Sequence, residues 1–111
     1  MSEQNDKKKP EKRHDRTGRS QMLTLIHKNQ LRQSFAYSYL LESQYTESAE
    51  GDWITLNFGF AKVQLGGRGI ESIYHEITQH HAAELNEIDA SDLSPNRGGI
   101  LKIIIVRPED E

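Results

Sequence analysis

The sequence predicts a single α+β domain built as a two-layer sandwich. Apolar and polar residues alternate between positions 37 and 65, which is the pattern of antiparallel strands. Residues 70–88 instead carry apolar side chains at helical spacing, and residues 100–106 form a short run rich in β-branched residues. The expected order is a three-strand antiparallel meander, one amphipathic helix and a C-terminal strand, with an extra N-terminal helix as an option.

The N-terminal segment differs in charge from the rest of the chain. The 111 residues carry a net charge of −3, but residues 1–20 contain seven basic and four acidic side chains, which leaves −6 on the remainder. The only large apolar residue of this segment is Met1. Such a segment cannot bury enough apolar surface to offset its ordering entropy. We therefore predict a disordered basic tail at 1–19, one domain at 20–108 and a frayed acidic end at 109–111.

Residues 20–36 fit two structures. Ser20 could cap a helix in which Leu23, Ile26 and Leu31 form one stripe. Residues 22–26 could equally form a short strand. The helix is the preferred interpretation.

The meander is expected to comprise strands at about 37–46, 52–58 and 60–65. The alternation slips by one residue after Phe58, and a slip of one would turn the strand over. Gly59 can correct it through a tight turn. Tyr37, Tyr39 and Tyr45 would share one face of the first strand, with Trp53 across the hairpin, and could form a protein-binding surface. Aromatic pairs that fill the core are the preferred interpretation.

A glycine cluster, Gly66-Gly67-Arg68-Gly69, separates the meander from the helix. Free backbone N–H groups before a helix, with a guanidinium beside them, could bind an anion. The cluster matches neither a dinucleotide-binding motif nor a P-loop. A sharp strand-to-helix turn is therefore preferred, and anion binding is the alternative.

The helix is expected to run from Ile70 to about Asp89. His81 falls in its apolar stripe, His80 lies on the flank, and Glu84 follows one turn later. These three side chains could converge on a metal or act as an acid–base pair. Adjacent histidines lack the four-residue spacing of helical zinc sites, so an ordinary helix-surface pair is preferred. We predict no metal and no cofactor.

The C-terminal strand, 100–106, is apolar on both faces, which is typical of a strand covered on both sides. Ile104 and Val106 point to the same face. Either residues 20–36 or a second copy of the chain could provide the second cover. Ile104 and Val106, together with Tyr37, Tyr39, Tyr45 and Trp53, are therefore candidate partner-binding residues.

Composition excludes several functions. The chain contains no cysteine, which rules out disulfides, Cys-ligated zinc, iron–sulfur clusters and thiol catalysis. It has no Gly-x-Ser-x-Gly turn for a serine nucleophile. The polar N-terminus lacks the apolar core of a signal peptide, and the longest apolar run, 103–106, is too short to span a bilayer. We expect a cytoplasmic protein without a membrane partner.

These observations do not determine a biochemical function. The best hypothesis is a small non-enzymatic module that binds a protein partner or itself as a homodimer. One alternative is a nucleic-acid-associated protein whose tail contacts phosphates through Lys7, Lys8, Lys9, Lys12 and Arg13. The other is a small metal-binding or acid–base enzyme that uses His80, His81 and Glu84.

Overall fold

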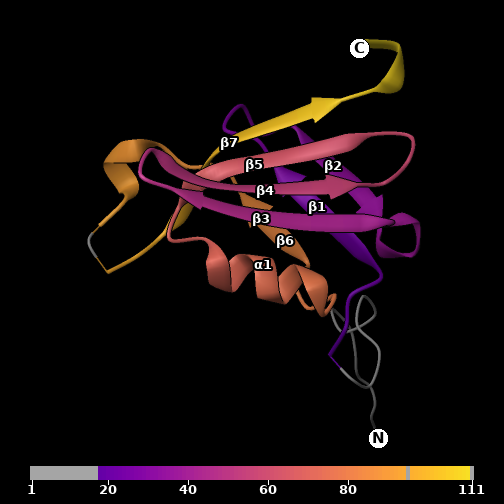
Figure 1. Cartoon of the computed structure of the whole chain (residues 1–111), viewed down its shortest axis with the longest axis horizontal. Helices are drawn as coiled ribbons and strands as arrows, with labels where there is room; N and C mark the ends of the chain where they lie inside the picture. Colours follow the sequence, from indigo (N-terminus) through magenta and orange to yellow (C-terminus); the bar gives the residue numbers. More distant parts are fainter. Residues whose placement is uncertain (1–17, 95, 111) are drawn as a thin grey trace, which may run out of the picture.

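The computed structural model describes residues 18–94 and 96–110 and confirms the α+β class. These residues form seven strands in two sheets, one α-helix and three short 3-10 helices (Figure 1). The predicted tail and the five basic residues proposed for nucleic-acid contact fall outside the described residues, apart from the two tail positions 18 and 19. In chain order the elements are β1 (Met22–Ile26), β2 (Arg32–Ala36), η3 (Tyr37–Tyr39), β3 (Glu42–Ser48), β4 (Gly51–Asn57), β5 (Lys62–Arg68), α1 (Glu71–Thr78), β6 (Glu84–Asn86), η4 (Ala90–Asp92), β7 (Gly99–Val106) and η5 (Pro108–Asp110).

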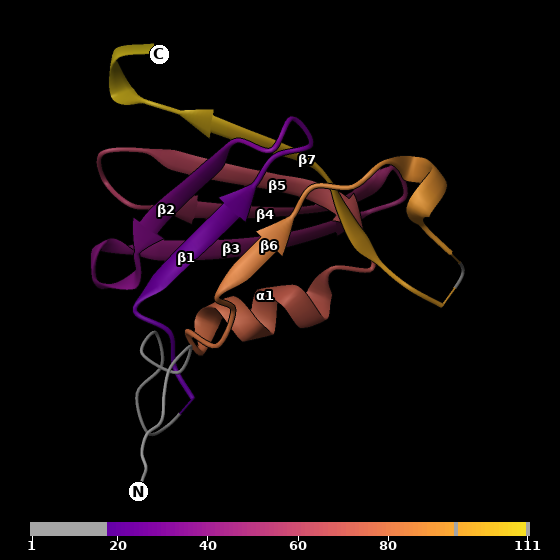
Figure 2. The same cartoon turned by 180° about the vertical axis from the view of Figure 1, so that it is seen from behind.

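The two sheets pack against each other. The four-stranded sheet has the order β3-β4-β5-β7, with every neighbouring pair antiparallel. The three-stranded sheet has the order β2-β1-β6, in which β1 is antiparallel to β2 and parallel to β6. Figure 2 shows the three-stranded sheet crossing the other obliquely, with α1 along one side of the sandwich. The second layer is therefore a sheet, whereas the sequence led us to expect a helix there.

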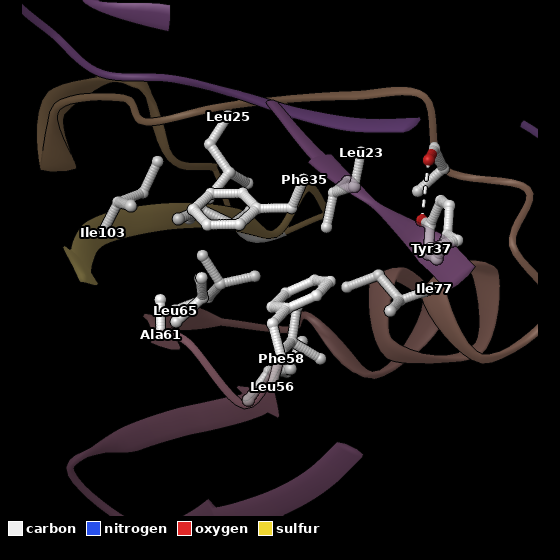
Figure 3. Close-up of a cluster of buried hydrophobic side chains, with 14 of the residues drawn as sticks. Leu23, Leu25, Phe35, Tyr37, Leu56, Phe58, Ala61, Leu65, Ile77 and Ile103 are labelled. Carbon is white, nitrogen blue, oxygen red and sulfur yellow. Dashed lines mark hydrogen bonds between the residues drawn. The ribbon is translucent and has the colours of Figure 1, made fainter. Parts of the chain in front are cut away.

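The core fills the space between the sheets (Figure 3). Leu25 and Phe35 of the three-stranded sheet lie opposite Leu65 of the four-stranded sheet, and all three are buried. Ile77 of α1 is fully buried and closes the side of this space. Full burial of one such side chain stabilises the fold by roughly 1.5–3 kcal/mol relative to exposure. The contact between the two sheets is therefore a main source of stability.

The extra helix predicted within residues 20–36 is wrong, and the strand alternative at 22–26 is correct. Leu23 and Leu25 are both fully buried in β1. Residues two apart share one face of a strand but not one face of a helix. β2 pairs with β1 so that Phe35 lies opposite Leu23, and Gln30 makes the intervening turn with a φ of 75°. The helical spacing in this segment was coincidental.

The meander is confirmed, but its first strand begins later than predicted. Residues 37–39 form η3, so the strand starts at Glu42. The tight turn predicted at Gly59 is also confirmed, since this residue has a φ of 86° between β4 and β5. Phe58 N–H donates to the Ala61 carbonyl across the turn.

The helix ends at Thr78, well before its predicted end near Asp89. His80 adopts a left-handed φ of 62°, and its N–H donates to the Ile77 carbonyl. The N–H of the next residue donates to the Glu76 carbonyl, which completes a Schellman helix end. The apolar residues beyond this end belong to other structure.

The apolar residues in the second half of the predicted helical stripe lie on β6 and just after it. Leu85 pairs with Leu25 of β1 in parallel register, and Ile88 N–H donates to the Ile100 carbonyl at 2.8 Å. These partners are distant in sequence, so a local periodicity could not reveal them. The pairing places β6 in the three-stranded sheet.

Gly66 and Gly67 belong to β5 and do not form the predicted turn. A Cβ on Gly67 would lie 2.1 Å from the Gly99 carbonyl oxygen, and one on Gly98 would lie 2.3 Å from the Gly69 carbonyl oxygen. These positions must be glycine because the backbones at the end of β5 and the start of β7 touch. Gly69, with a φ of 62°, makes the turn into α1.

We predict that Gly67→Ala destabilises the protein by about 1–3 kcal/mol, since the new methyl group meets backbone atoms that cannot move independently. Gly66→Ala is the matched control and should cost less stability. Its Cβ would meet the side chain of Trp53, which can shift, and not backbone atoms. Urea unfolding followed by circular dichroism measures both changes. Equal losses in the two variants would contradict this reading of the close approach.

Candidate functional site

The two sheets meet where β6 runs past the start of β7. Glu87 forms a parallel bridge with Ile100, and its N–H donates to the Ile26 carbonyl of β1 at 2.9 Å. The register between β5 and β7 shifts here, with Leu101 as the extra residue of a bulge. Beyond the bulge, β7 continues as the last strand of the four-stranded sheet.

The Glu87 carboxylate holds this junction together. Its Oε1 accepts the backbone N–H of Lys28 at 3.0 Å, and its Oε2 accepts the backbone N–H of Ile103 at 3.1 Å. Lys28 lies in the turn between β1 and β2, so one side chain connects that hairpin with β7. The Ile103 N–H therefore points away from β5. Alternate residues of an antiparallel strand direct their backbone groups to the same side, so Ile105 also faces this outer edge.

One side of β7 pairs with β5. On the other side, the stretch Ile103–Val106, termed the β7 edge, has no neighbouring strand among the described residues. It consists of three isoleucines and one valine, side chains that favour extended structure. Ile104, Ile105 and Val106 are only half-buried. A regular apolar strand with open backbone groups is a surface on which another strand can pair. We take the β7 edge as the candidate functional site.

The other terminal strands are protected in ways that the β7 edge is not. β3 carries Glu42 and Glu47 and lies beside α1. β2 contributes the polar residues 32–34, and β6 is only three residues long. Charges, helix cover and short length are the usual devices against edge pairing. Among these terminal strands, only β7 combines length with an apolar edge.

The outer face of the four-stranded sheet is polar beside β7. Ile104 lies opposite Gln64 of β5, and Val106 lies opposite Lys62. Trp53 is 39% exposed on the outer side of β4, where its ring lies against Gly66. Residues 20–36, one of the two predicted covers for β7, form the opposite layer and leave this outer face uncovered.

Two of the predicted partner-binding tyrosines point inward. Tyr37 is 3% exposed, and its hydroxyl donates to the Ala82 carbonyl at 2.7 Å (Figure 3). Desolvation, with a smaller contribution from a nearby glutamate, raises the pKa of Tyr37. The Tyr45 hydroxyl donates to the buried Asp52 carboxylate at 3.1 Å, and its ring stacks on Tyr74. Desolvation and then this hydrogen bond raise the pKa of Tyr45 to about 12. Tyr37 is therefore not available as a surface anchor, whereas Tyr45 is only partly buried.

Tyr39 is exposed and belongs to an apolar patch at one end of the sandwich. It contacts Phe60 edge-on at a centroid distance of 6.0 Å, and Leu41 is 72% exposed nearby on the chain. We term Tyr39, Leu41 and Phe60 the turn-end patch. A hollow of about 230 Å³, lined in part by Gly59 and Val106, lies between the β4–β5 turn and the end of β7. Sequence reasoning missed Leu41 and Phe60, because alternation alone does not show which end of a strand leaves the core.

The helix-surface pair expected for His80, His81 and Glu84 is wrong, because the helix ends before these residues. His80 and His81 follow α1, and Glu84 begins β6. Among the described residues, no three His, Cys, Asp or Glu side chains are placed to hold a metal ion. His80 stacks on Tyr37 with ring centroids 4.4 Å apart. Its surroundings are those of a structural side chain at a helix end.

In the predicted anion site, Gly66 and Gly67 are buried within β5, while Arg68 and Gly69 are exposed at its end. Arg68 borders a hollow of about 580 Å³. The cluster thus contributes one cationic side chain to the surface, and its first two glycines serve backbone packing.

No helix within the described ranges is long and apolar enough to cross a membrane. No protein-family model, curated protein or solved structure matches the chain. The function must therefore be argued from the geometry of the chain itself.

We predict that Glu87→Ala destabilises the protein by about 1–3 kcal/mol, because two backbone N–H groups lose a charged acceptor. Glu47→Ala, on exposed β3, serves as the control and should change stability by less than about 0.5 kcal/mol. Chemical unfolding measures both values. A neutral Glu87→Ala would mean that the junction does not depend on this carboxylate.

We also predict a loss of stability in mild acid that depends on His80. Desolvation, followed by the nearby charges of Arg19 and His81, lowers the pKa of His80 below 6.5. The folded state therefore prefers the neutral ring. The stabilisation that comes from keeping the His80 ring neutral is fully present above pH 6.5 and is lost as the pH falls through the lowered pKa.

The unfolding free energy should accordingly decrease less between pH 7.5 and 5.0 in His80→Asn than in the wild type. Asparagine tolerates the left-handed backbone and does not titrate. His75→Asn, at an exposed position on α1, should retain the His80-dependent part of the pH response. Identical pH profiles for the wild type and His80→Asn would refute the assignment.

Proposed function

We propose that this chain is a non-enzymatic protein-interaction module that pairs with a second copy of itself through the β7 edge. One observation carries the proposal: among the terminal strands of the two sheets, β7 alone presents a long, apolar and unprotected edge. Pairing would give partners to the outward backbone groups and would cover the half-exposed side chains beside them.

The pairing geometry is that of two antiparallel strands related by a twofold axis. With Ile105 opposite its own symmetry mate, each copy donates one N–H and accepts one in return. In this register the carbonyl of Ile103 faces the N–H of Arg107 from the other copy, while Glu87 retains the N–H of Ile103. The two four-stranded sheets become one sheet of eight strands. The junction within each copy is left intact.

A second copy is the preferred occupant because the edge is self-complementary. An antiparallel twofold arrangement needs only one kind of surface, and it places this apolar run against itself. Ile104 of one copy then lies beside Val106 of the other on the outer face. The hollow at Val106 lies next to this contact.

The proposal predicts a particle of twice the chain mass in sedimentation and in light scattering after size exclusion. The double variants Ile104→Glu/Val106→Glu and Ile104→Lys/Val106→Lys should each be monomeric, because like charges would face each other across the axis. An equimolar mixture of the two variants should restore the dimer as a heterodimer. This rescue shows that both variants are folded, and it does not depend on the register.

Thr55→Glu and Thr55→Lys are the matched controls. Thr55 lies in the same cross-strand row as Ile104, but two strands further in, about 10 Å away. These variants should remain dimeric. A wild-type protein that is monomeric at all accessible concentrations would overturn the proposal, as would a mixture without heterodimers. A stable monomer that captures an unrelated extended peptide at β7 would overturn the choice of a second copy.

A further inference from the structure

A hollow larger than the one at Val106 lies away from the β7 edge, between the end of β5 and the loop that leads into β7. Its volume is about 580 Å³, within the range of small-molecule sites. Arg68 and Gly69 line one side, and Leu93, Arg97, Gly98 and Leu101 line the other. The close approach of Gly98 to the Gly69 carbonyl holds the two sides together.

Positive charge gathers at this hollow on an otherwise acidic body. Two arginines line it and no carboxylate does, although residues 21–111 carry a net charge of −6. Neither guanidinium forms a hydrogen bond or an ion pair with the described residues. A neighbouring hollow on the other side of Arg68 is lined by Glu47 and Glu71 and so has the opposite character. Electrostatics therefore favour an anion on the Arg97 side.

Apart from Ser94, the other side chains that line the hollow are apolar. Leu93 and Leu101 are half-buried, and Ala90 adds a methyl group. A small inorganic anion would leave these apolar groups uncovered. An anion attached to an apolar group would match both parts of the hollow, since guanidinium groups bind carboxylates through paired hydrogen bonds.

We propose that this hollow binds an organic carboxylate, with the carboxylate between Arg68 and Arg97 and an apolar group against Leu93 and Leu101. The site is independent of the β7 edge, so it stands whether or not the chain forms dimers. The ligand class includes medium-chain fatty acids and peptides that end in an apolar residue.

The first experiment titrates octanoate into the full-length wild-type protein and follows backbone amide shifts by NMR. Shift changes should concentrate at residues 68–69 and 93–101. Octanol and octylammonium carry the same apolar group without the negative charge, and inorganic phosphate carries the charge without the apolar group. All three should bind at least about tenfold more weakly. Equal binding of octanol or phosphate would overturn the proposal.

The second experiment compares variants. Arg68→Gln and Arg97→Gln should each weaken octanoate binding about tenfold, whereas Arg32→Gln, an exposed arginine on β2, should not change it. An equal loss in Arg32→Gln would indicate a nonspecific charge effect and refute the site. N-acetyl-leucyl-leucine and its C-terminal amide test the peptide source. Binding of the acid but not the amide supports a peptide ligand, and failure of both octanoate and this acid refutes the proposal.

Discussion

The fold depends on the contact between the end of β6 and the start of β7. The two sheets share no other strand pairing in the described structure, and the Glu87 carboxylate accepts backbone N–H groups from both sides of the contact. A carboxylate can accept two such hydrogen bonds at once, which a neutral side chain of similar size does less well. This side chain and the strand bridge beside it therefore tie the three-stranded sheet to the four-stranded sheet at one end of the core.

The same junction determines which part of β7 stays open. Up to Ile103 the outer side of the strand is occupied by Glu87 and Ile88, which follow β6, and beyond Ile103 the described structure provides no partner strand. The bulge at Leu101 turns β7 away from β6, so a single sheet cannot continue through all seven strands. An open strand edge is thus a direct consequence of how the sandwich is closed.

Close backbone contacts between glycines also shape the start of β7. Gly67 touches Gly99 within the β5–β7 pair, and Gly69 touches Gly98, so the two segments that follow β5 and precede β7 lie side by side. Arg68 and Arg97 each lie next to one of these glycines in sequence, so the contact also places both arginines around one hollow. The glycine contacts thus also determine where the two arginines lie, because each arginine is adjacent in sequence to a contacting glycine.

The existence of the three meander strands, the turn at Gly59 and the C-terminal strand could be predicted from the sequence, because period-two alternation, a glycine between two strands and a β-branched run reflect local preferences. The sequence did not determine where α1 ends, what forms the second layer or which apolar residues are exposed. Those features depend on contacts such as that of Leu25 with Leu85, which lie 60 positions apart. For the open edge, the sequence predicted only an apolar strand whose two faces both need to be covered. Which side of β7 is open follows from the fold, since it depends on where the chain after β6 leaves the strand.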